Sequence, residues 1–484
     1  MSPAAQGESG WRAKSTIPAL VIPAALLFVA SEAGGVRLLA LALLGLPLLA
    51  YLVAAPEQLL SLLVIVSISL GNAVGASGID IGVRIYGLDI LLVAGAAAAL
   101  AMRAEHPSSG TAGDSRIWWI TGTLVLYGLL SLMIGLGAHH AIRDSLGDFR
   151  RMFCYPLASF LIFRVYLRAR GDLRSMAWLL GISGAVIMVI VATRVLTGSS
   201  YREQAFSVPG EAIRYLSYSE AAGASFLALA AVTGVFIARK PLRPLLLTVF
   251  TVAAVLVVMS NYRTAWLSLA FGLLASGVVA ARRKLVWALR LLGTALLIGT
   301  AALLLLRASP LWPLLSEKFS TSNLISTGSW RLFSWAKAYV VWRQHPWFGV
   351  GLGYKHEFYR LGEGLQGLYL NKGNTIHNDL LWVLVNTGVV GAALLFWFFA
   401  TILARALRSV RDLGTNAGSA GSVVVATCVG QLVVVTVTAM FQPTVSLGSN
   451  GVVLGLLAAT LLEWGSGRRD QGAAPIPTVA AGAA

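Results

Sequence analysis

The sequence predicts an all-α polytopic integral membrane protein with about 12–14 transmembrane helices and one large extracytoplasmic loop between the late helices. Hydrophobic residues make up 57% of the 484 residues and charged residues only 12%, unlike the composition of soluble domains. Apolar runs of about 20 residues, long enough to cross a bilayer as helices, recur along the chain. Each such run must satisfy its own backbone hydrogen bonds in lipid, which a helix does.

The apolar runs cover most of the chain apart from one long gap. They lie near residues 16–32, 36–54, 57–72, 85–102, 117–137, 152–168, 175–195, 215–237, 245–260, 263–281, 285–305, 379–403, 421–441 and 446–463. This pattern predicts four parts: an N-terminal transmembrane bundle (1–306), a large loop (307–378), C-terminal transmembrane helices (379–464) and a disordered tail (465–484) rich in Gly, Ala and Pro.

Basic residues orient this bundle in the membrane. The chain has 37 Lys and Arg against 20 Asp and Glu, a formal net charge of +17. Most of the basic residues lie in alternate short connections between spans, and such connections face the cytoplasm. Arg12, Lys14, Arg468 and Arg469 place both termini and the tail on that side, so the large loop is predicted to be external. Because this charge serves membrane orientation, we predict no nucleic-acid partner.

Several arginines depart from this pattern and lie at the predicted external ends of spans or in external loops. They are Arg150, Arg151, Arg202, Arg214, Arg263 and Arg331. Guanidinium groups bind phosphate oxygens bidentately and stay charged when partly desolvated. Together they could form a cationic ring for a lipid diphosphate, whose polyprenyl tail would stay in the bilayer. The alternative is that some of them reach lipid headgroups or pair with acids such as Asp144 and Asp148.

The large loop carries the other candidate side chains. His377, in NTIHNDLLWVLVNTG, precedes an apolar run, and a neutral imidazole there can accept a proton from an attacking hydroxyl. His377 can equally be a cap or an interfacial hydrogen-bonding residue, and Asn378 or Asp379 can cap the next helix. The glycines of GVGLG at 349–353 permit tight turns and a close backbone approach to a ligand.

Two further patterns in the sequence bear on the loop and on cofactors. In SWRLFSWAKAYVVWRQH, Trp335, Tyr339 and Trp342 recur at helical spacing, which predicts an amphipathic helix on the membrane surface. The remaining histidines do not have the spacing of metal ligands: His139, His140, His345 and His356. We therefore predict no metal and no other cofactor.

The ordered motifs of the loop resemble the superfamily of O-antigen ligases and Wzy-type O-antigen and exopolysaccharide polymerases. These motifs are R-x-x-x-W at Arg331–Trp335, HPWFGVGLG at 345–353, HND at 377–379 and NTG at 386–388, with Arg263 in SNYRTAW just after a span. The resemblance implies an inverting, metal-independent glycosyltransferase in the bacterial inner membrane. Its donor would be a glycan on undecaprenyl diphosphate, presented on the periplasmic or external face.

The resemblance also implies roles for particular residues. His377 matches a histidine that activates the acceptor or organises the site, and Arg263 and Arg331 match arginines that engage the diphosphate. We place these three as catalytic, and the substrate-binding candidates are Arg214, Arg151, Arg150, Arg202, Gly351 and Asn378. The acceptor would be lipid A core for a ligase or a growing glycan for a polymerase, with a slight preference for the polymerase because the predicted spans are numerous.

Other partners and functions remain open on the sequence. Membrane lipids surround such a protein, and polysaccharide assembly machinery is a possible partner. A flippase or transporter of lipid-linked glycans would also need cations within a helical bundle, but transporters usually place their site near the midplane. A scaffold within an assembly complex would leave the arginine and histidine arrangement unexplained.

Overall fold

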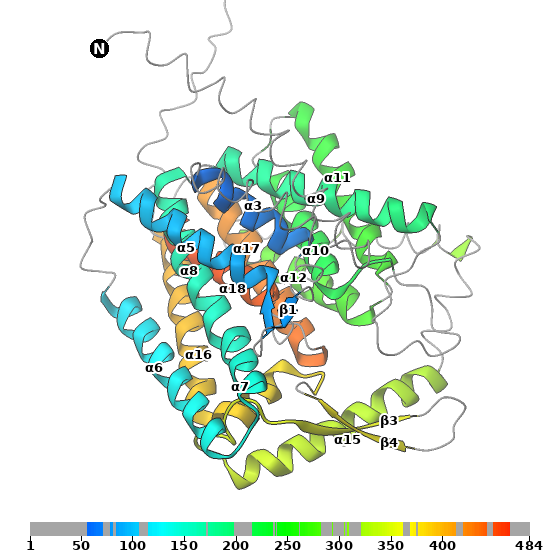
Figure 1. The fold of residues 1–484 in the computed structure, drawn as a ribbon. Helices are drawn as coiled ribbons and strands as arrows, with labels where there is room; N and C mark the ends of the chain where they lie inside the picture. The colour runs from blue at the N-terminus through cyan, green and yellow to red at the C-terminus, as the bar shows by residue number, and fades with distance from the viewer. Residues whose placement is uncertain are drawn as a thin grey trace, which may run out of the picture.

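The computed structural model describes residues 56–70, 78–80, 84–105, 115–170, 173–197, 215–235, 240–260, 262–281, 321–361, 368–373, 376–412, 420–442 and 449–464, with a few isolated positions between them. Over these ranges the protein is a bundle of α-helices with two short hairpins (Figure 1). The predicted disordered tail at 465–484 lies outside the described residues.

The helices follow the order of the predicted spans. They are α3 (Pro56–Ser69), α5 (Gly87–Glu105), α6 (Ser115–Gly137), α7 (Ile142–Phe149), the π-helix η3 (Arg150–Cys154), α8 (Tyr155–Arg170), α9 (Leu173–Leu196), α10 (Tyr218–Gly234), the 3₁₀-helix η4 (Lys240–Leu242), α11 (Arg243–Met259), α12 (Arg263–Ala281), α15 (Thr321–Gln344), α16 (Asp379–Asp412), α17 (Ala420–Phe441) and α18 (Ser449–Trp464). Each predicted span that falls on described residues coincides with a helix. The spans near 16–32, 36–54 and 285–305 fall outside them.

The lengths and composition of these helices confirm a multi-pass membrane protein. In the described part of the chain, 6 helices are long and apolar enough to cross a membrane: Gly87–Ala104, Ser115–Gly137, Met176–Leu196, Lys240–Met259, Asp379–Arg408 and Gly421–Phe441. Three shorter apolar helices accompany them, at Glu57–Ser69, Arg263–Val279 and Asn450–Trp464. Exposed side chains such as Trp119, Leu126 and Phe396 give several of these helices an apolar outer surface, as lipid contact requires.

The interior of the bundle is built on helices that approach closely. Helix α12 packs antiparallel to α17, with Ser276 Oγ donating to the Ala426 carbonyl at 2.9 Å. Gly272 and Gly430 face each other's helices at this contact, where an added Cβ would meet the opposite backbone. Small residues at such crossings let helices pack by van der Waals contact without a hydrophobic driving force, which lipid does not provide.

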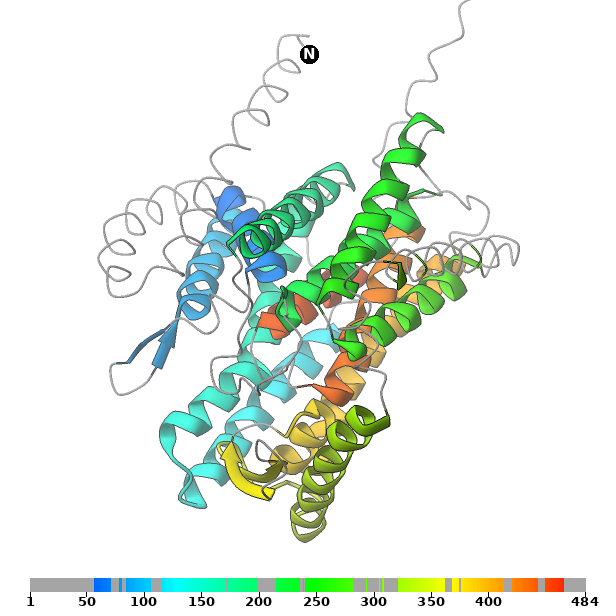
Figure 2. The ribbon, with the colours of Figure 1, turned by 90° about the vertical axis from the view of Figure 1, so that its right-hand side faces the viewer.

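Two antiparallel hairpins add to the helical prediction. Strands β1 (Gly78–Asp80) and β2 (Arg84–Tyr86) form one, and β3 (His356–Leu361) and β4 (Leu368–Gly373) form the other, with His356 opposite Gly373. The second hairpin lies within the large loop, where residues such as Phe358, Tyr359 and Tyr369 favour strands. With α15 and α7, this hairpin occupies one end of the molecule, and α11 extends toward the other (Figures 1 and 2).

Candidate functional site

The C-terminal end of α17 is the point at which the predicted site segments meet. Because α12 and α17 are antiparallel and joined at Ser276 and Ala426, the start of α12 and the end of α17 lie at the same end of the pair. Arg263 is about 20 Å along α12 from Ser276, and Gln442 is about 24 Å along α17 from Ala426, at 1.5 Å per residue. Arg263, which is half-buried, therefore lies at the level of the α17 terminus.

Helix α15 brings Arg331 to the same place. The Trp335 ring lies 6.2 Å from the ring of Phe441, the last residue of α17. Arg331 precedes Trp335 by one helical turn, so both share a face of α15. Ser334 and Ala338 on the inner side of this helix are buried, whereas Leu332 and Val340 on its outer side are 63% and 56% exposed.

His377 completes this cluster from the segment that leads into α16. Its Nδ1 lies 3.4 Å from Oε1 of Gln442, the residue after Phe441. His377 has a φ of 52°, in the left-handed region that residues other than glycine rarely adopt. The next residue, Asn378, accepts a hydrogen bond from the Leu381 N–H at 2.9 Å through Oδ1, so its side chain caps α16.

A backbone strap, residues 345–353 with the sequence HPWFGVGLG, fixes the start of α16. Helix α16 is interrupted at Gly388, which has φ 64° and ψ −172°. The strap binds the carbonyl and N–H groups on both sides of this break and one carbonyl of α6. The hydrogen bonds run from Val350 N to Val385 O (2.9 Å), Gly351 N to Asn386 O (3.1 Å), Leu352 N to Ser131 O (3.1 Å), Val389 N to Pro346 O (2.8 Å) and Val390 N to Trp347 O (3.1 Å). Two motifs that are far apart in the sequence, HPWFGVGLG and NTG, are therefore one structural unit.

The glycines of the strap are required by this packing. Gly351 has a φ of 83°, and a Cβ there would collide with the backbone of Gly135 in α6. Gly353 has a φ of 88° and lies against Ser145 of α7. The close backbone approach that the sequence suggested for a ligand is thus made to neighbouring helices. The predicted contact of Gly351 with substrate stays a prediction.

Arg150 and Arg151 belong to a second polar cluster, on η3 beside α5 and α7. Arg150 forms an ion pair with Asp89 at 2.8 Å, and Asp89 also accepts from the Tyr155 hydroxyl at 2.7 Å. Arg151 donates to the Tyr86 hydroxyl at 3.2 Å. The alternative of pairing with acids therefore applies to Arg150, whose partner is Asp89, and to Arg151, which lies 4.0 Å from the predicted Asp148.

Asp148 on α7 links this second cluster to the strap. Its side chain is fully buried, and Oδ2 accepts from the Gly353 N–H at 3.0 Å while Arg151 stands 4.0 Å from Oδ1. Burial raises the pKa of the Asp148 carboxyl to about 7, against the opposing effects of Arg151 and of the Gly353 hydrogen bond. Asp148 is therefore protonated more readily than an ordinary aspartate.

Two further buried polar groups are His356 on β3 and the ion pair of Arg194 and Glu220 between α9 and α10. His356 on β3 is 2% exposed, and burial lowers its pKa to about 3, so the ring is neutral. Arg194 of α9 pairs with Glu220 of α10 at 2.8 Å and donates to the Tyr215 carbonyl at 2.7 Å. Glu220 also forms a capping box with Ser217.

The helix that is capped in this way, α10, contacts the start of α12 through its first residue. Tyr218, the first residue of α10, stacks on Tyr262 with ring centroids 3.7 Å apart, directly before Arg263. Arg214 and Arg202 lie outside the described residues, so their predicted roles stay predictions.

The sequence did not point to Gln442, Phe441 or Asp89 as members of these clusters, whereas it did name Asp148 as a partner for the arginines. The only signal for Gln442 is a lone polar residue that ends an apolar run before a proline. Within the described ranges, no three His, Cys, Asp or Glu side chains gather as ligands for a metal ion.

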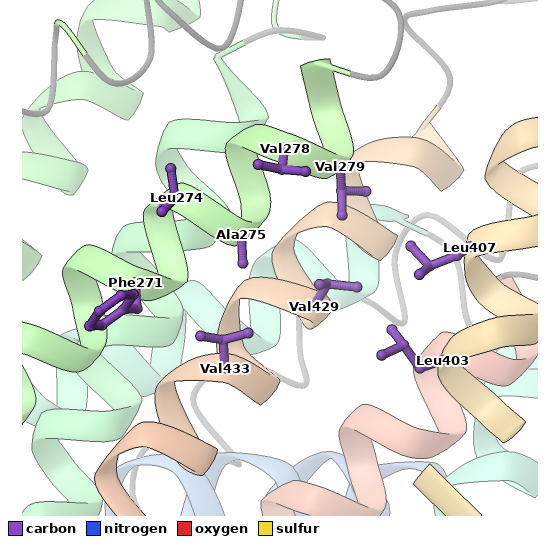
Figure 3. Close-up of a pocket in the computed structure, with 9 residues that line it drawn as sticks. All are labelled: Phe271, Leu274, Ala275, Val278, Val279, Leu403, Leu407, Val429 and Val433. Atoms are coloured by element: carbon purple, nitrogen blue, oxygen red, sulfur yellow. The ribbon is translucent and has the colours of Figure 1, made fainter. Parts of the chain in front are cut away.

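An apolar groove of about 360 Å³ lies between α12, α16 and α17. Figure 3 shows side chains of α12, α16 and α17 lining it: Phe271, Leu274, Ala275, Val278, Val279, Leu403, Leu407, Val429 and Val433. Phe271 is about 12 Å along α12 from Arg263. The groove is therefore separated from the polar cluster by some two turns of helix.

Comparison with known proteins bears on the loop and its flanking helices. Residues 248–396 match the model of a family described as O-antigen ligase. The matched segment includes Arg263, Arg331, the strap, His377 and Asn378, whereas Arg150, Arg151 and Gln442 lie outside it. A search of curated proteins gives no match.

Proposed function

Through residues 248–396 the chain belongs to the O-antigen ligase family, and we propose that it transfers a glycan from an undecaprenyl-diphosphate donor to an acceptor saccharide. The family makes it a multi-pass membrane glycosyltransferase of the ligase or polymerase type. In our proposal the transfer takes place on the external face of the bacterial inner membrane, with inversion at the anomeric carbon and without a metal ion.

The observation that carries this proposal is the meeting of three elements at the end of α17. Trp335, one helical turn after Arg331 on α15, lies against Phe441, and His377 lies beside Gln442. Arg263 lies at the same level along the α12–α17 pair. Two cations and one imidazole in the same region supply what a diphosphate leaving group and a hydroxyl nucleophile need. No other cluster in the described part of the chain combines these three parts of the family segment.

In the proposed reaction, Arg263 and Arg331 bind the donor diphosphate and stabilise the charge that develops on it. His377 accepts the proton of the acceptor hydroxyl as its oxygen attacks the anomeric carbon. The bond from that carbon to the phosphate oxygen breaks, and the electron pair leaves with the diphosphate. Arg214 is proposed as a third diphosphate ligand, with Arg202, Arg151 and Arg150 at the edge of the site.

The polyprenyl tail of the donor would lie along the apolar groove of Figure 3. Helices α12, α16 and α17 line this groove, and Arg263, His377 and Gln442 of the polar cluster lie at or next to ends of these helices. A lipid with a charged head and a long apolar tail fits such an arrangement, because each part meets surfaces of its own polarity. An acceptor sugar would reach His377 from the water phase or from a second lipid.

Transfer in reconstituted vesicles tests the proposal. The purified protein would receive undecaprenyl-diphosphate oligosaccharide, with lipid A core or a second lipid-linked glycan offered separately. A single addition to lipid A core would identify a ligase, and a ladder of longer glycans from the second acceptor would identify a polymerase, the outcome that we favour. Movement of the lipid-linked glycan across the membrane with neither product would reject the enzyme in favour of a transporter.

A further inference from the structure

Gln442 is held rigidly at the end of α17. It is 4% exposed, and its backbone N–H still donates to the Thr438 carbonyl at 2.9 Å, so the helical hydrogen bonding extends to this residue. The neighbouring Phe441 packs on Trp335 of α15. The position of the Gln442 amide is therefore set by α17 and not by a flexible loop.

His377 is held just as closely from its own side. Ile376 is 1% exposed, and Asn378 caps α16, so both neighbours of the histidine are fixed. Its left-handed backbone costs free energy relative to an ordinary helical or extended residue. Such a conformation persists only where the surroundings determine it, and it often marks a functional position.

The contact between the two side chains selects one form of the imidazole. Oε1 of an amide accepts hydrogen bonds and cannot donate. In this orientation of the Gln442 amide, with Oε1 3.4 Å from Nδ1 of His377, a hydrogen bond between them requires the ring hydrogen on Nδ1. In a neutral ring, Nε2 then carries the lone pair.

We propose that Gln442 is a positioning residue that holds His377 in the tautomer whose Nε2 accepts the acceptor proton. This inference rests on the proposed function, in which His377 is the base. In the transfer step the acceptor O–H bond breaks, its proton goes to Nε2 and its oxygen joins the anomeric carbon. The resulting imidazolium keeps its Nδ1–H directed at Gln442, so the ring does not have to turn during the reaction.

Two substitutions at this position separate hydrogen bonding from shape. Gln442→Met keeps the length of the side chain and removes the acceptor. Gln442→Glu keeps an acceptor oxygen and adds a negative charge, which stabilises the imidazolium. Gln431→Met is the matched control, because Gln431 lies on the same helix, is 1% exposed and makes one hydrogen bond, to the Ala222 carbonyl at 2.9 Å.

The experiment measures kcat, KM for the donor and the pH profile of transfer for the full-length protein in vesicles. We expect Gln442→Met to lower kcat by about tenfold or more, the equivalent of one lost hydrogen bond to the reacting group, with KM nearly unchanged. Gln442→Glu should retain most of the rate and move the acidic limb of the profile to higher pH. The charged groups on the elements that meet here are the same in every variant, and they include Arg263 on α12, Arg331, Lys337 and Arg343 on α15 and Asp379 at the start of α16.

The control Gln431→Met tests the role of Gln442, and His377→Ala tests the role of His377 as the base. Gln431→Met should keep both the rate and the pH profile of the native protein. A native rate for Gln442→Met, an unmoved acidic limb for Gln442→Glu, or equal effects at Gln431 and Gln442 would each overturn the role of Gln442. A native rate for His377→Ala would instead reject His377 as the base, and with it the proposed reaction.

Discussion

The residues of the HND motif divide two tasks between neighbouring positions. His377 adopts a left-handed backbone and points Nδ1 at Gln442, whereas Asn378 uses its side-chain oxygen to cap α16. The sequence allowed a cap at either Asn378 or Asp379, and the structure selects Asn378. The cap uses only Oδ1 of Asn378, so its Nδ2 group can still donate to substrate, and the predicted binding role of Asn378 stays a prediction.

Gly351→Ala is predicted to destabilise the protein, because residue 351 has a positive φ that favours glycine. A left-handed conformation costs an ordinary residue about 1–2 kcal/mol, and the new Cβ would also push α6 away at Gly135. Thermal unfolding of the purified protein in detergent should show a clear drop in midpoint. The control is Gly122→Ala on α6, the helix against which Gly351 packs. Nothing lies within 4 Å of a Cβ added at Gly122, so this change is expected to stabilise the protein slightly. Loss of transfer at Gly351 with unchanged stability would favour the ligand contact instead.

Asp148→Asn is predicted to stabilise the protein in a pH-dependent way. Because the folded protein holds the Asp148 proton to about pH 7 and the unfolded chain releases it near 3.8, the free energy of unfolding falls as pH rises through this window. Asparagine stays neutral and can still accept from Gly353. The gain in unfolding midpoint over the native protein should therefore be absent near pH 4 and full near pH 8. An equal gain at both pH values would show that charge burial is not its source.

The sequence could indicate which residues have suitable chemistry at this scale but not their partners. Arg331 stands out because it lies on the predicted external side, against the cytoplasmic pattern of the basic residues, and His377 because it directly precedes an apolar run. Gln442 contacts His377 across 65 residues of sequence, and Arg150 finds Asp89 across 61. Such pairs follow from helix packing, which the periodicity of one chain does not specify.

Elements of the fold show why the strap and the break in α16 occur together. A helix interrupted at Gly388 leaves carbonyl and N–H groups unsatisfied within the bundle, and such groups are costly away from water. The strap supplies partners for them, so the break is stable and α16 starts at a fixed place. The packing of HPWFGVGLG therefore fixes the start of α16, and with it the position of His377, which precedes this helix.

Glu220→Gln is predicted to be strongly destabilising, by about 3–5 kcal/mol, because it removes the carboxylate that balances the buried Arg194 charge. Glutamine can still accept from the Ser217 N–H, so the capping box changes little. Asp144→Asn is the comparison, since its partner Lys355 is 54% exposed. That change should cost less than about 1 kcal/mol. Similar losses in the unfolding midpoint of both variants would contradict this account of the α9–α10 contact.

At the scale of elements the sequence was a good guide to the spans and a poor one to the loop. Apolar length alone located the helices, because a bilayer imposes that length on each of them. The β3–β4 hairpin and the π-helix at Arg150 were not foreseen. The hairpin does carry a turn signal, the glycine-rich connection GEGLQG at 362–367 between its six-residue strands, whereas a single π-turn leaves little trace in the sequence.

For the whole molecule, the orientation in the membrane is a prediction from charge. It can be tested because the strap and the last turn of α5 are predicted to lie on opposite sides of the membrane. A cysteine at Lys355, beside the strap, should react with a membrane-impermeant maleimide from outside the cell, in a background with Cys154 and Cys428 replaced. A cysteine at the exposed Arg103, in a predicted cytoplasmic connection, should react only after the membrane is disrupted. The reverse pattern would place the polar cluster on the cytoplasmic side and remove the external donor.

The measurement that tests the central claim most directly is the initial rate of glycan transfer by His377→Ala in vesicles, at matched amounts of folded protein. The account predicts a fall in kcat of roughly 100- to 10,000-fold, the usual contribution of a general base. Unfolding midpoint and donor binding should stay close to those of the native protein, because Arg263 and Arg331 remain in place. Transfer at the native rate would contradict the account, since the imidazole at the end of α17 would then take no part in the reaction.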